Sequence, residues 1–128
     1  MRRRGVGKYG VSPAQARTWD GKVWDSKAEM RHAQQLALRL KAGDVDGYEI
    51  QQRFPLSGAD GKTMVATYVA DFVVKKGDQR WVEEVKGMET REWKLKARMF
   101  KVQYPRIPLV VYDAGGNLIR TKEIGGAR

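Results

Sequence analysis

Charged residues interrupt two neighbouring apolar segments of the chain. Asp71 lies within residues 68–74, and Glu84 and Lys86 lie within residues 81–87. Two carboxylates that face each other repel unless a cation lies between them. Lys86 alone could be that cation, in an ion pair on a sheet. The alternative is a divalent metal such as Mg²⁺, which prefers carboxylate oxygens and keeps several waters.

The two alternatives differ in the chemistry that they allow. A metal held by Asp71 and Glu84 would orient a water, lower its pKa and stabilise charge on a phosphate undergoing in-line displacement. Lys86 would then stabilise the developing negative charge or help to activate the attacking water. On their types and spacing alone, these residues leave both the ion pair and the metal site open.

The length of one turn decides whether the three charges meet. Side chains alternate along a strand, so Glu84 and Lys86 share a face. If Gly77-Asp78 is a two-residue turn, residue 76 pairs with 79 and Asp71 lies opposite Glu84. A loop of three or five residues would oppose Asp71 to residue 83 or 85 instead. The simplest register therefore predicts a cluster of Asp71, Glu84 and Lys86.

Glu29 is a candidate third carboxylate. The segment from Ser26 to Glu29 fits a capping box, in which Glu29 would only satisfy the start of a helix. Its position also falls on the apolar stripe of Ala33, Leu36 and Leu40, so the side chain is expected to face inward. Cap and metal ligand both remain open for Glu29.

Basic residues gather at two places that suit a phosphate backbone. The chain carries 25 Lys plus Arg against 15 Asp plus Glu, a net charge of +10, which favours a polyanionic partner. Residues 1–14 are expected to form a flexible basic arm and residues 15–128 a single domain. The basic candidates for DNA contact are Arg2, Arg3, Arg4 and Lys8 in the arm, and Arg91, Lys94, Arg98 and Lys101 along a helix. A merely solvated surface is the alternative for both groups.

Other classes of protein fit less well. The single histidine, His32, has too few partners for a His-based nuclease or zinc site, and we interpret it as an ordinary helix residue. The absence of cysteine excludes a disulfide framework and a thiolate metal site. No apolar run approaches the length of a membrane span, and the basic N-terminus lacks the apolar segment of a signal peptide. We therefore expect no membrane partner and a cytoplasmic location.

Hydrophobic patterning predicts an α/β domain that positions these residues. A small hairpin over 18–24 precedes a helix from residue 25 or 26 to about 42. Strands are expected at 48–56, 64–74 and 79–86, a helix at 90–104, a strand at 108–112 and a hairpin arm at 117–124. Short loops make the first three strands antiparallel, and the helical crossover makes the fourth parallel to a neighbour. The predicted product is a mixed sheet, in the order α-β-β-β-α-β, with a helix on each face.

The motifs also occur in a recognisable order. They are the segments 25–29 (DSKAE), 49–54 (EIQQRF), 68–72 (YVADF), 84–87 (EVKG) and 93–96 (WKLK). Together they resemble a small phage and prophage family of the PD-(D/E)xK nuclease superfamily, which has the restriction-endonuclease-like fold. The resemblance runs from about Lys22 to Pro105. The Pro of the superfamily's name is absent, because Ala70 precedes Asp71.

The resemblance implies a Mg²⁺-dependent endonuclease, with Mn²⁺ as a possible substitute. Asp71, Glu84 and the additional carboxylate of Glu29 would be metal ligands, and Lys86 the catalytic lysine. Gln51 matches a polar position that would line the site and contact DNA. Small phage members of the superfamily include dimeric resolvases of branched DNA, which makes Holliday-junction cleavage in phage DNA recombination, in the host cytoplasm, the leading expectation.

Two other functions remain as rivals. A non-catalytic nucleic-acid-binding protein would use its carboxylates only to balance Lys86 and nearby arginines. A sequence-specific restriction-type endonuclease would need a target-recognition insertion, for which the chain has little room.

Overall fold

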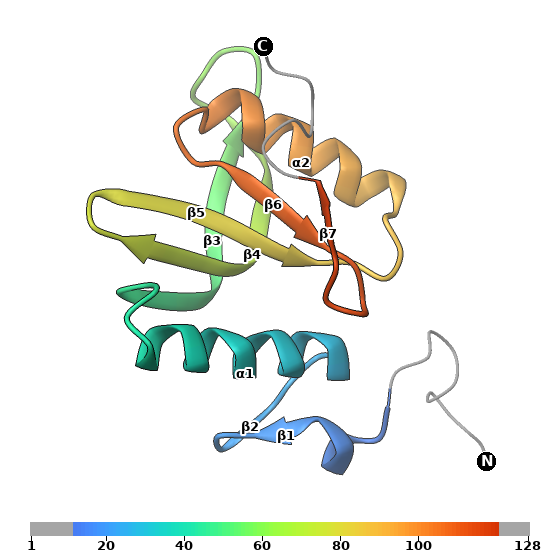
Figure 1. Cartoon of the computed structure of the whole chain (residues 1–128). Helices are drawn as coiled ribbons and strands as arrows, with labels where there is room; N and C mark the ends of the chain where they lie inside the picture. The colour runs from blue at the N-terminus through green and yellow to red at the C-terminus, as the bar shows by residue number, and fades with distance from the viewer. Residues whose placement is uncertain (1–11, 121–128) are drawn as a thin grey trace, which may run out of the picture.

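A computed structural model describes residues 12–120 as a five-stranded mixed sheet with one helix packed on each side (Figure 1). No helix in this part of the chain is long and apolar enough to cross a membrane. The elements in chain order are the 3-10 helix η2 (Ala14–Arg17), β1 (Thr18–Trp19), β2 (Lys22–Val23), α1 (Lys27–Lys41), β3 (Gly47–Ser57), β4 (Met64–Lys76), β5 (Gln79–Val85), α2 (Arg91–Gln103), β6 (Leu109–Tyr112) and β7 (Leu118–Arg120).

The sheet has the strand order β3-β4-β5-β6-β7 and the predicted mixture of directions. β3, β4 and β5 are antiparallel, and β6 runs parallel to β5 after the crossover through α2. β7 pairs antiparallel with β6, as the hairpin arm required, although residues 121–124 of that arm lie outside the described residues. The predicted α/β class and helix-flanked mixed sheet are therefore confirmed.

Both helices begin at a capping side chain. Ser26 accepts a hydrogen bond from the backbone N–H of Glu29 at the start of α1, and Thr90 accepts one from Trp93 at the start of α2. Such caps satisfy N–H groups that have no partner inside the helix. After α1, Gly43 adopts a φ of 82°, the left-handed conformation in which helices commonly end.

The sheet separates two hydrophobic clusters, one beneath each helix. The α2 cluster consists of Phe54, Leu56, Tyr68, Ala70, Val73, Val82, Ala97, Phe100, Ile107, Leu109 and Val111. The α1 cluster consists of Trp24, Ala33, Leu36, Val45, Phe72 and Val74. Each helix is thus held on the sheet by its own apolar face. The sheet itself lies between the two clusters.

The inward face of α1 differs from the predicted stripe. Ala33 and Leu36 are buried as expected, but Leu40 is 42% exposed. Glu29 and His32 are buried in its place. The inward face is therefore rotated toward two polar residues, and the interpretation of His32 as an ordinary helix residue was wrong.

β3 and β4 change faces near their middle. Ile50 and Phe72 form a pair on the α1 side, whereas Phe54 and Tyr68 form a pair on the α2 side, although all four positions are even-numbered. Between the pairs lies Gln51, whose φ of 57° is left-handed and breaks the two-residue alternation. Figure 1 shows β3 turning sharply along its length. Asp71 lies on β4 at the same level as this turn.

Candidate functional site

The β4–β5 hairpin has the register that brings the charges together. Gly77 and Asp78 form a two-residue turn, with Gly77 at a φ of 59°. Lys76 pairs with Gln79, and the ladder continues without a shift to the pair Phe72 and Glu83. The next positions along the two strands are Asp71 and Glu84, so the predicted register is confirmed.

The pairing of β4 with β5 stops just before the two carboxylates. Beyond that point, backbone N–H groups bind the carboxylates instead of the neighbouring strand. The N–H of Asp71 donates to Glu84 Oε2 at 3.2 Å, and the N–H of Val85 donates to Asp71 Oδ2 at 2.9 Å. Backbone donors freed from strand pairing thus bind the carboxylates directly. Because buried N–H groups need partners, this arrangement fixes both acids at the point where β4 and β5 separate.

Glu84 is fully buried, and its two oxygens have different surroundings. Oε2 accepts hydrogen bonds from the Tyr68 hydroxyl, at 2.5 Å, and from the N–H of Asp71. Oε1 has no hydrogen-bond partner and lies 3.5 Å from Lys86 Nζ. Burial and the neighbouring charge of Asp71 raise the pKa of Glu84 to about 8. An ionisable oxygen that is buried and lacks a hydrogen bond is unusual, and it is directed at the Lys86 ammonium.

Lys86 lies between the acidic cluster and α2. Its side chain is 23% exposed, and its Nζ lies 5.2 Å from the centroid of the Trp93 ring. The ring face and the Glu84 carboxylate both attract the ammonium, so the charge is held at the edge of the cluster. Lys86 therefore reaches Glu84 and solvent at the same time.

Glu29 reaches the cluster from α1. Only its backbone N–H takes part in capping, at 3.0 Å from Ser26 Oγ, while its carboxylate accepts a hydrogen bond from Gln51 Nε2 at 3.4 Å. Burial and the nearby carboxylate of Asp71 raise the pKa of Glu29 to about 9. The carboxylate of Glu29 thus belongs to the cluster.

The cluster has the donor chemistry of a site for a hard divalent cation. Glu29, Asp71 and Glu84 supply carboxylate oxygens, and the charge of Asp71 helps to raise the pKa values of Glu29 and Glu84. Glu84 Oε1 has no hydrogen-bond partner. Within residues 12–120, no three His, Cys, Asp or Glu side chains converge closely enough to form a ready-made metal cage. Mg²⁺ does not need one, because it binds through one or two carboxylates, waters and substrate phosphates. These residues fit such an ion.

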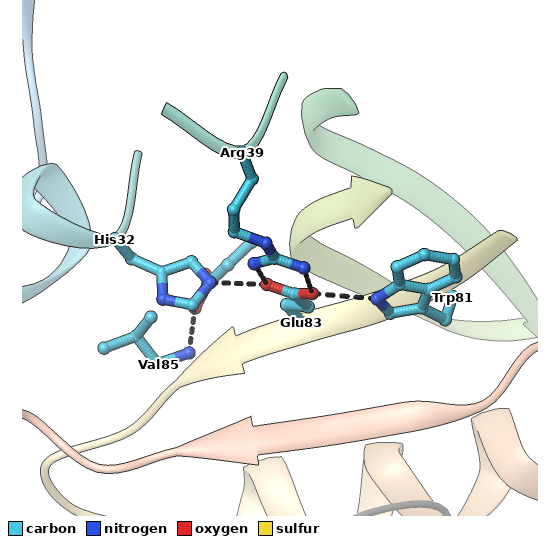
Figure 2. A network of polar contacts seen from close by, with 6 residues as sticks. His32, Arg39, Trp81, Glu83 and Val85 are labelled. Atoms are coloured by element: carbon cyan, nitrogen blue, oxygen red, sulfur yellow. Dashed lines mark hydrogen bonds and ion pairs between the residues drawn. The ribbon is translucent and has the colours of Figure 1, made fainter. Parts of the chain in front are cut away.

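On the α1 side of β5, Glu83 forms a second polar cluster (Figure 2). Its carboxylate accepts hydrogen bonds from His32 Nε2 at 2.7 Å, from both terminal nitrogens of Arg39 at 3.0 and 2.9 Å, and from Trp81 Nε1 at 2.8 Å. Burial raises the pKa of Glu83, but the donors outweigh it, and the pKa falls to about 2. Glu83 is therefore a buried anion with both oxygens satisfied.

The predicted basic residues do not all reach the surface. Arg91, Lys94 and Arg98 are exposed on α2, as a phosphate-binding face requires. Lys101 is buried, only 8% exposed, so including it in that exposed face was wrong. Gln51 is exposed beside Glu29. Arg2, Arg3, Arg4 and Lys8 lie outside the described residues, as does most of the predicted arm.

A cleft of about 830 Å³ lies next to the acidic cluster. It is bounded by the starts of both helices and by the end of β5, and Val85 and Gly87, on either side of Lys86, line it. Lys27 and Arg31 also line it, and within residues 12–120 neither side chain has a hydrogen-bond or ion-pair partner. Unpaired cations beside buried carboxylates make the cleft a candidate path for a polyanion.

Sequence reasoning missed Tyr68 and the Glu83 cluster. Two-residue alternation places Tyr68 on the face opposite Asp71, and only the turn at Gln51 brings its hydroxyl to Glu84. Two-residue alternation along β5 places Glu83 on the face opposite Glu84 but does not name its partners. A buried strand carrying adjacent glutamates, with His32 and Arg39 two helical turns apart, was the available signal for a second polar cluster.

A family described as "Protein of unknown function (DUF1064)" has a sequence model that matches residues 7–114. The chain belongs to the DUF1064 family. The matched range contains η2 and all the elements from β1 to β6, so the acidic cluster, Lys86 and the Glu83 cluster are all part of the DUF1064 region. No curated protein matches the chain significantly.

Proposed function

We propose that this DUF1064 chain is a divalent-metal-dependent endodeoxyribonuclease of the PD-(D/E)xK type, with a restriction-endonuclease-like core. The observation that carries the proposal is the environment of Glu84. One of its oxygens is buried without a hydrogen bond, beside Asp71 and 3.5 Å from the Lys86 ammonium. An ion pair between Glu84 and Lys86 alone would need neither Asp71 beside Glu84 nor Glu29 near Asp71.

Each residue of the cluster has a part in phosphodiester hydrolysis. Asp71, Glu84 and Glu29 would hold Mg²⁺ or Mn²⁺, which would lower the pKa of a bound water and stabilise charge on the scissile phosphate. Lys86 donates a hydrogen bond from Nζ to the attacking water or to a non-bridging phosphate oxygen, where negative charge develops. Tyr68 orients Glu84, and Gln51 orients Glu29.

The protons on the carboxylates link the metal to pH. With pKa values of about 8 and 9, Glu84 and Glu29 are protonated at neutral pH while no cation is bound. Ligation needs the ionised forms, so metal binding releases protons and strengthens as the pH rises. Cleavage is accordingly expected to be faster at pH 8 than at pH 6.

The path of the DNA follows the unpaired cations. Lys27 and Arg31 in the cleft and the exposed Arg91, Lys94 and Arg98 on α2 bind phosphates on two sides of the cluster. Phosphate contacts of this kind fix position and carry no sequence information. We extend the proposal to branched duplex DNA cleaved by a homodimer, by analogy with small phage resolvases.

Cleavage assays test the proposal directly. Supercoiled plasmid, a four-way junction and linear duplexes of varied sequence are incubated with the full chain in Mg²⁺, Mn²⁺ or EDTA. Cleavage only with metal, abolished by Asp71→Asn and reduced at least 10²-fold by Lys86→Met, is the expected result. Asp78→Asn and Lys75→Met are matched controls, because both residues are exposed at the other end of the same hairpin.

The substrates also separate the rival functions. Junction cleavage in preference to duplexes supports the branched-DNA proposal, while cleavage of one duplex sequence supports a restriction-type enzyme. A chain that binds DNA but cleaves none of these substrates, and that keeps its binding but loses stability with Asp71→Ala, is a non-catalytic binding protein. In that case Lys86 and Glu84 form only an ion pair.

A further inference from the structure

Glu83 is a buried charged residue that has no part in the proposed reaction. Its carboxylate is only 1% exposed, yet it is not part of the acidic cluster. Burying a charge is costly, and an apolar residue of similar volume often stabilises a fold at least as well. Four hydrogen bonds to one buried carboxylate have fixed geometry, which apolar packing does not provide. This suggests that Glu83 fixes the position of the elements that carry its donors.

The donors from α1 lie on one line along the helix. His32 follows Glu29 by three residues, one turn, and Arg39 follows His32 by seven, two turns. At 1.5 Å per residue, the two contacts fix α1 over roughly 10 Å of its axis, and Glu29 lies about 4.5 Å beyond them. Two such contacts prevent α1 from sliding along or rotating about its axis. They therefore also fix the position of Glu29 on the same helix.

The apolar contacts of α1 do not impose this restriction. Ala33 and Leu36 pack on Phe72 and Val74, and hydrophobic burial is not directional. Glu29, Asp71 and Glu84 meanwhile repel one another whenever they are ionised, which pushes α1 away from the sheet. The bidentate contact of Arg39 and the imidazole of His32 supply geometric specificity that opposes this displacement (Figure 2).

We propose that Glu83, His32 and Arg39 form a positioning clamp, which fixes α1 on β5 and thereby holds Glu29 beside Asp71 and Glu84. The clamp rests on the proposed metal site and adds positioning residues to it. It connects neighbouring residues of β5, because Glu83 faces α1 while Glu84 faces the site. The clamp residues touch neither metal nor DNA.

The sharpest test removes the directional contacts and keeps the packing. The triple variant His32→Leu/Arg39→Met/Glu83→Met replaces the buried ionic group with apolar residues of similar volume. Such replacements often preserve or increase stability, so the melting temperature is expected to stay within a few degrees of wild type. The affinity for Mn²⁺ alone, measured by titration calorimetry on the full chain, is expected to fall 10- to 100-fold, as it does when second-layer contacts to metal ligands are lost.

Two further variants separate positioning from stability. Ile107→Ala lies in the cluster beneath α2, away from the clamp, and lowers the melting temperature while leaving the Mn²⁺ affinity unchanged. Arg39→Lys keeps the charge but cannot form the two-pronged contact, so it is expected to fold and to show an intermediate loss of affinity. Arg39→Lys also serves as the test if the triple variant does not fold.

The outcomes distinguish the clamp from the proposed function. Wild-type Mn²⁺ affinity in the folded triple variant and in Arg39→Lys overturns the clamp, while binding and cleavage by the wild type leave the nuclease standing. A wild-type chain that binds no Mn²⁺ and cleaves no DNA overturns both. Loss of affinity in Ile107→Ala in proportion to its lost stability also overturns the clamp, because the effect would then be general.

Discussion

At the scale of single residues, Glu84 combines one fixed oxygen with one unbonded oxygen. Tyr68 and the backbone of Asp71 hold Oε2, and Oε1 faces Lys86 without a hydrogen bond. The hydrogen bond from Tyr68 lowers the pKa of Glu84, against burial and the charge of Asp71, which raise it. Tyr68 is therefore expected to control how readily Glu84 ionises to bind a cation.

Tyr68→Phe tests the effect of Tyr68 on the ionisation of Glu84. Without the hydroxyl, the ionised form of Glu84 loses a hydrogen bond, its pKa rises further, and Mg²⁺ has to compete with a more firmly held proton. We expect about tenfold weaker Mg²⁺ binding at pH 7, largely restored at pH 9, when calorimetric titrations at the two pH values are compared. Tyr104→Phe is the control, because that hydroxyl donates to the Pro55 carbonyl instead. Equal affinity in both variants at pH 7 would remove Tyr68 from the site.

Glu29 and Glu84 also make the stability of the metal-free chain depend on pH. Their folded pKa values, about 9 and 8, lie above the ordinary 4.5 of the unfolded chain. The folded state binds the additional protons, so stability is complete below about pH 4.5 and falls as the pH rises through 8 and 9. The folded chain therefore contains a destabilising cluster of carboxylates, whose repulsion a bound cation would relieve.

Neutralising either acid is expected to stabilise the metal-free chain. Glu29→Gln and Glu84→Gln remove the ionisation that opposes folding, so each is expected to raise the free energy of unfolding at pH 8.5 by on the order of 2 kcal/mol, with little effect at pH 4.5. Urea denaturation in EDTA at the two pH values measures the difference. Glu49→Gln, at an exposed carboxylate on β3, is expected to change neither value. Both Gln variants are also expected to lose the stabilisation that Mg²⁺ would give wild type. A glutamine variant whose stability falls between pH 4.5 and pH 8.5 by as much as that of wild type would contradict the linkage.

At the scale of elements, the β4–β5 hairpin places the acids through its turn and through the end of its ladder. The turn could be predicted, because Gly77 followed by Asp78 between apolar segments favours two residues and fixes every pair down to Phe72 and Glu83. The separation of the strands beyond that pair could not. The separation occurs at the level of Gln51 in the neighbouring strand β3. Gln51 takes a left-handed conformation, which a glutamine does not indicate in a sequence.

The helices show the same limit of sequence reasoning. Helical periodicity located α1 and α2 to within a residue or two, because apolar spacing and capping residues are local signals. It placed Ala33 and Leu36 correctly on the inward face of α1, but it did not place every residue of the inward faces. Leu40 is exposed and His32 buried because a partner on β5, Glu83, outweighs one leucine. Lys101 is also buried.

A single inserted residue tests the importance of the turn. One glycine placed between Gly77 and Asp78 shifts the pairing by one residue and directs Glu84 toward α1, if the strands keep their other contacts. We expect Mn²⁺ binding and cleavage to be lost, with destabilisation because Val82 leaves its cluster. One glycine inserted between Gly58 and Ala59, in the loop joining β3 to β4, is the control and is expected to preserve both. Metal binding by the turn variant would show that the register does not assemble the site.

At the scale of the whole molecule, charge is unevenly distributed around the cluster. The cleft of about 830 Å³ opens beside Lys86, and a second cavity of about 760 Å³ lies among the β4–β5 turn, the end of α2 and the start of β6. Arg80 and Arg106 line the second cavity, which lies at the turn end of the β4–β5 hairpin. The first cavity is lined by Val85 and Gly87, the neighbours of Lys86, and by the unpaired cations Lys27 and Arg31, so it is where the strand nearest the scissile bond is expected to lie.

The double variant Lys27→Ala/Arg31→Ala tests that path. Each phosphate contact releases condensed counterions, so losing two is expected to weaken DNA binding and to flatten the dependence of log K on log salt by about 0.9 per contact. Fluorescence anisotropy from 50 to 200 mM salt, with Asp71→Asn in every protein to prevent cleavage, measures both quantities. Lys62→Ala/Lys75→Ala removes the same charge from exposed positions that do not line the cleft. Equal slopes in the two double variants would mean that net charge, rather than the cleft, attracts DNA. A flatter slope in the cleft variant alone would place the substrate strand between α1 and α2.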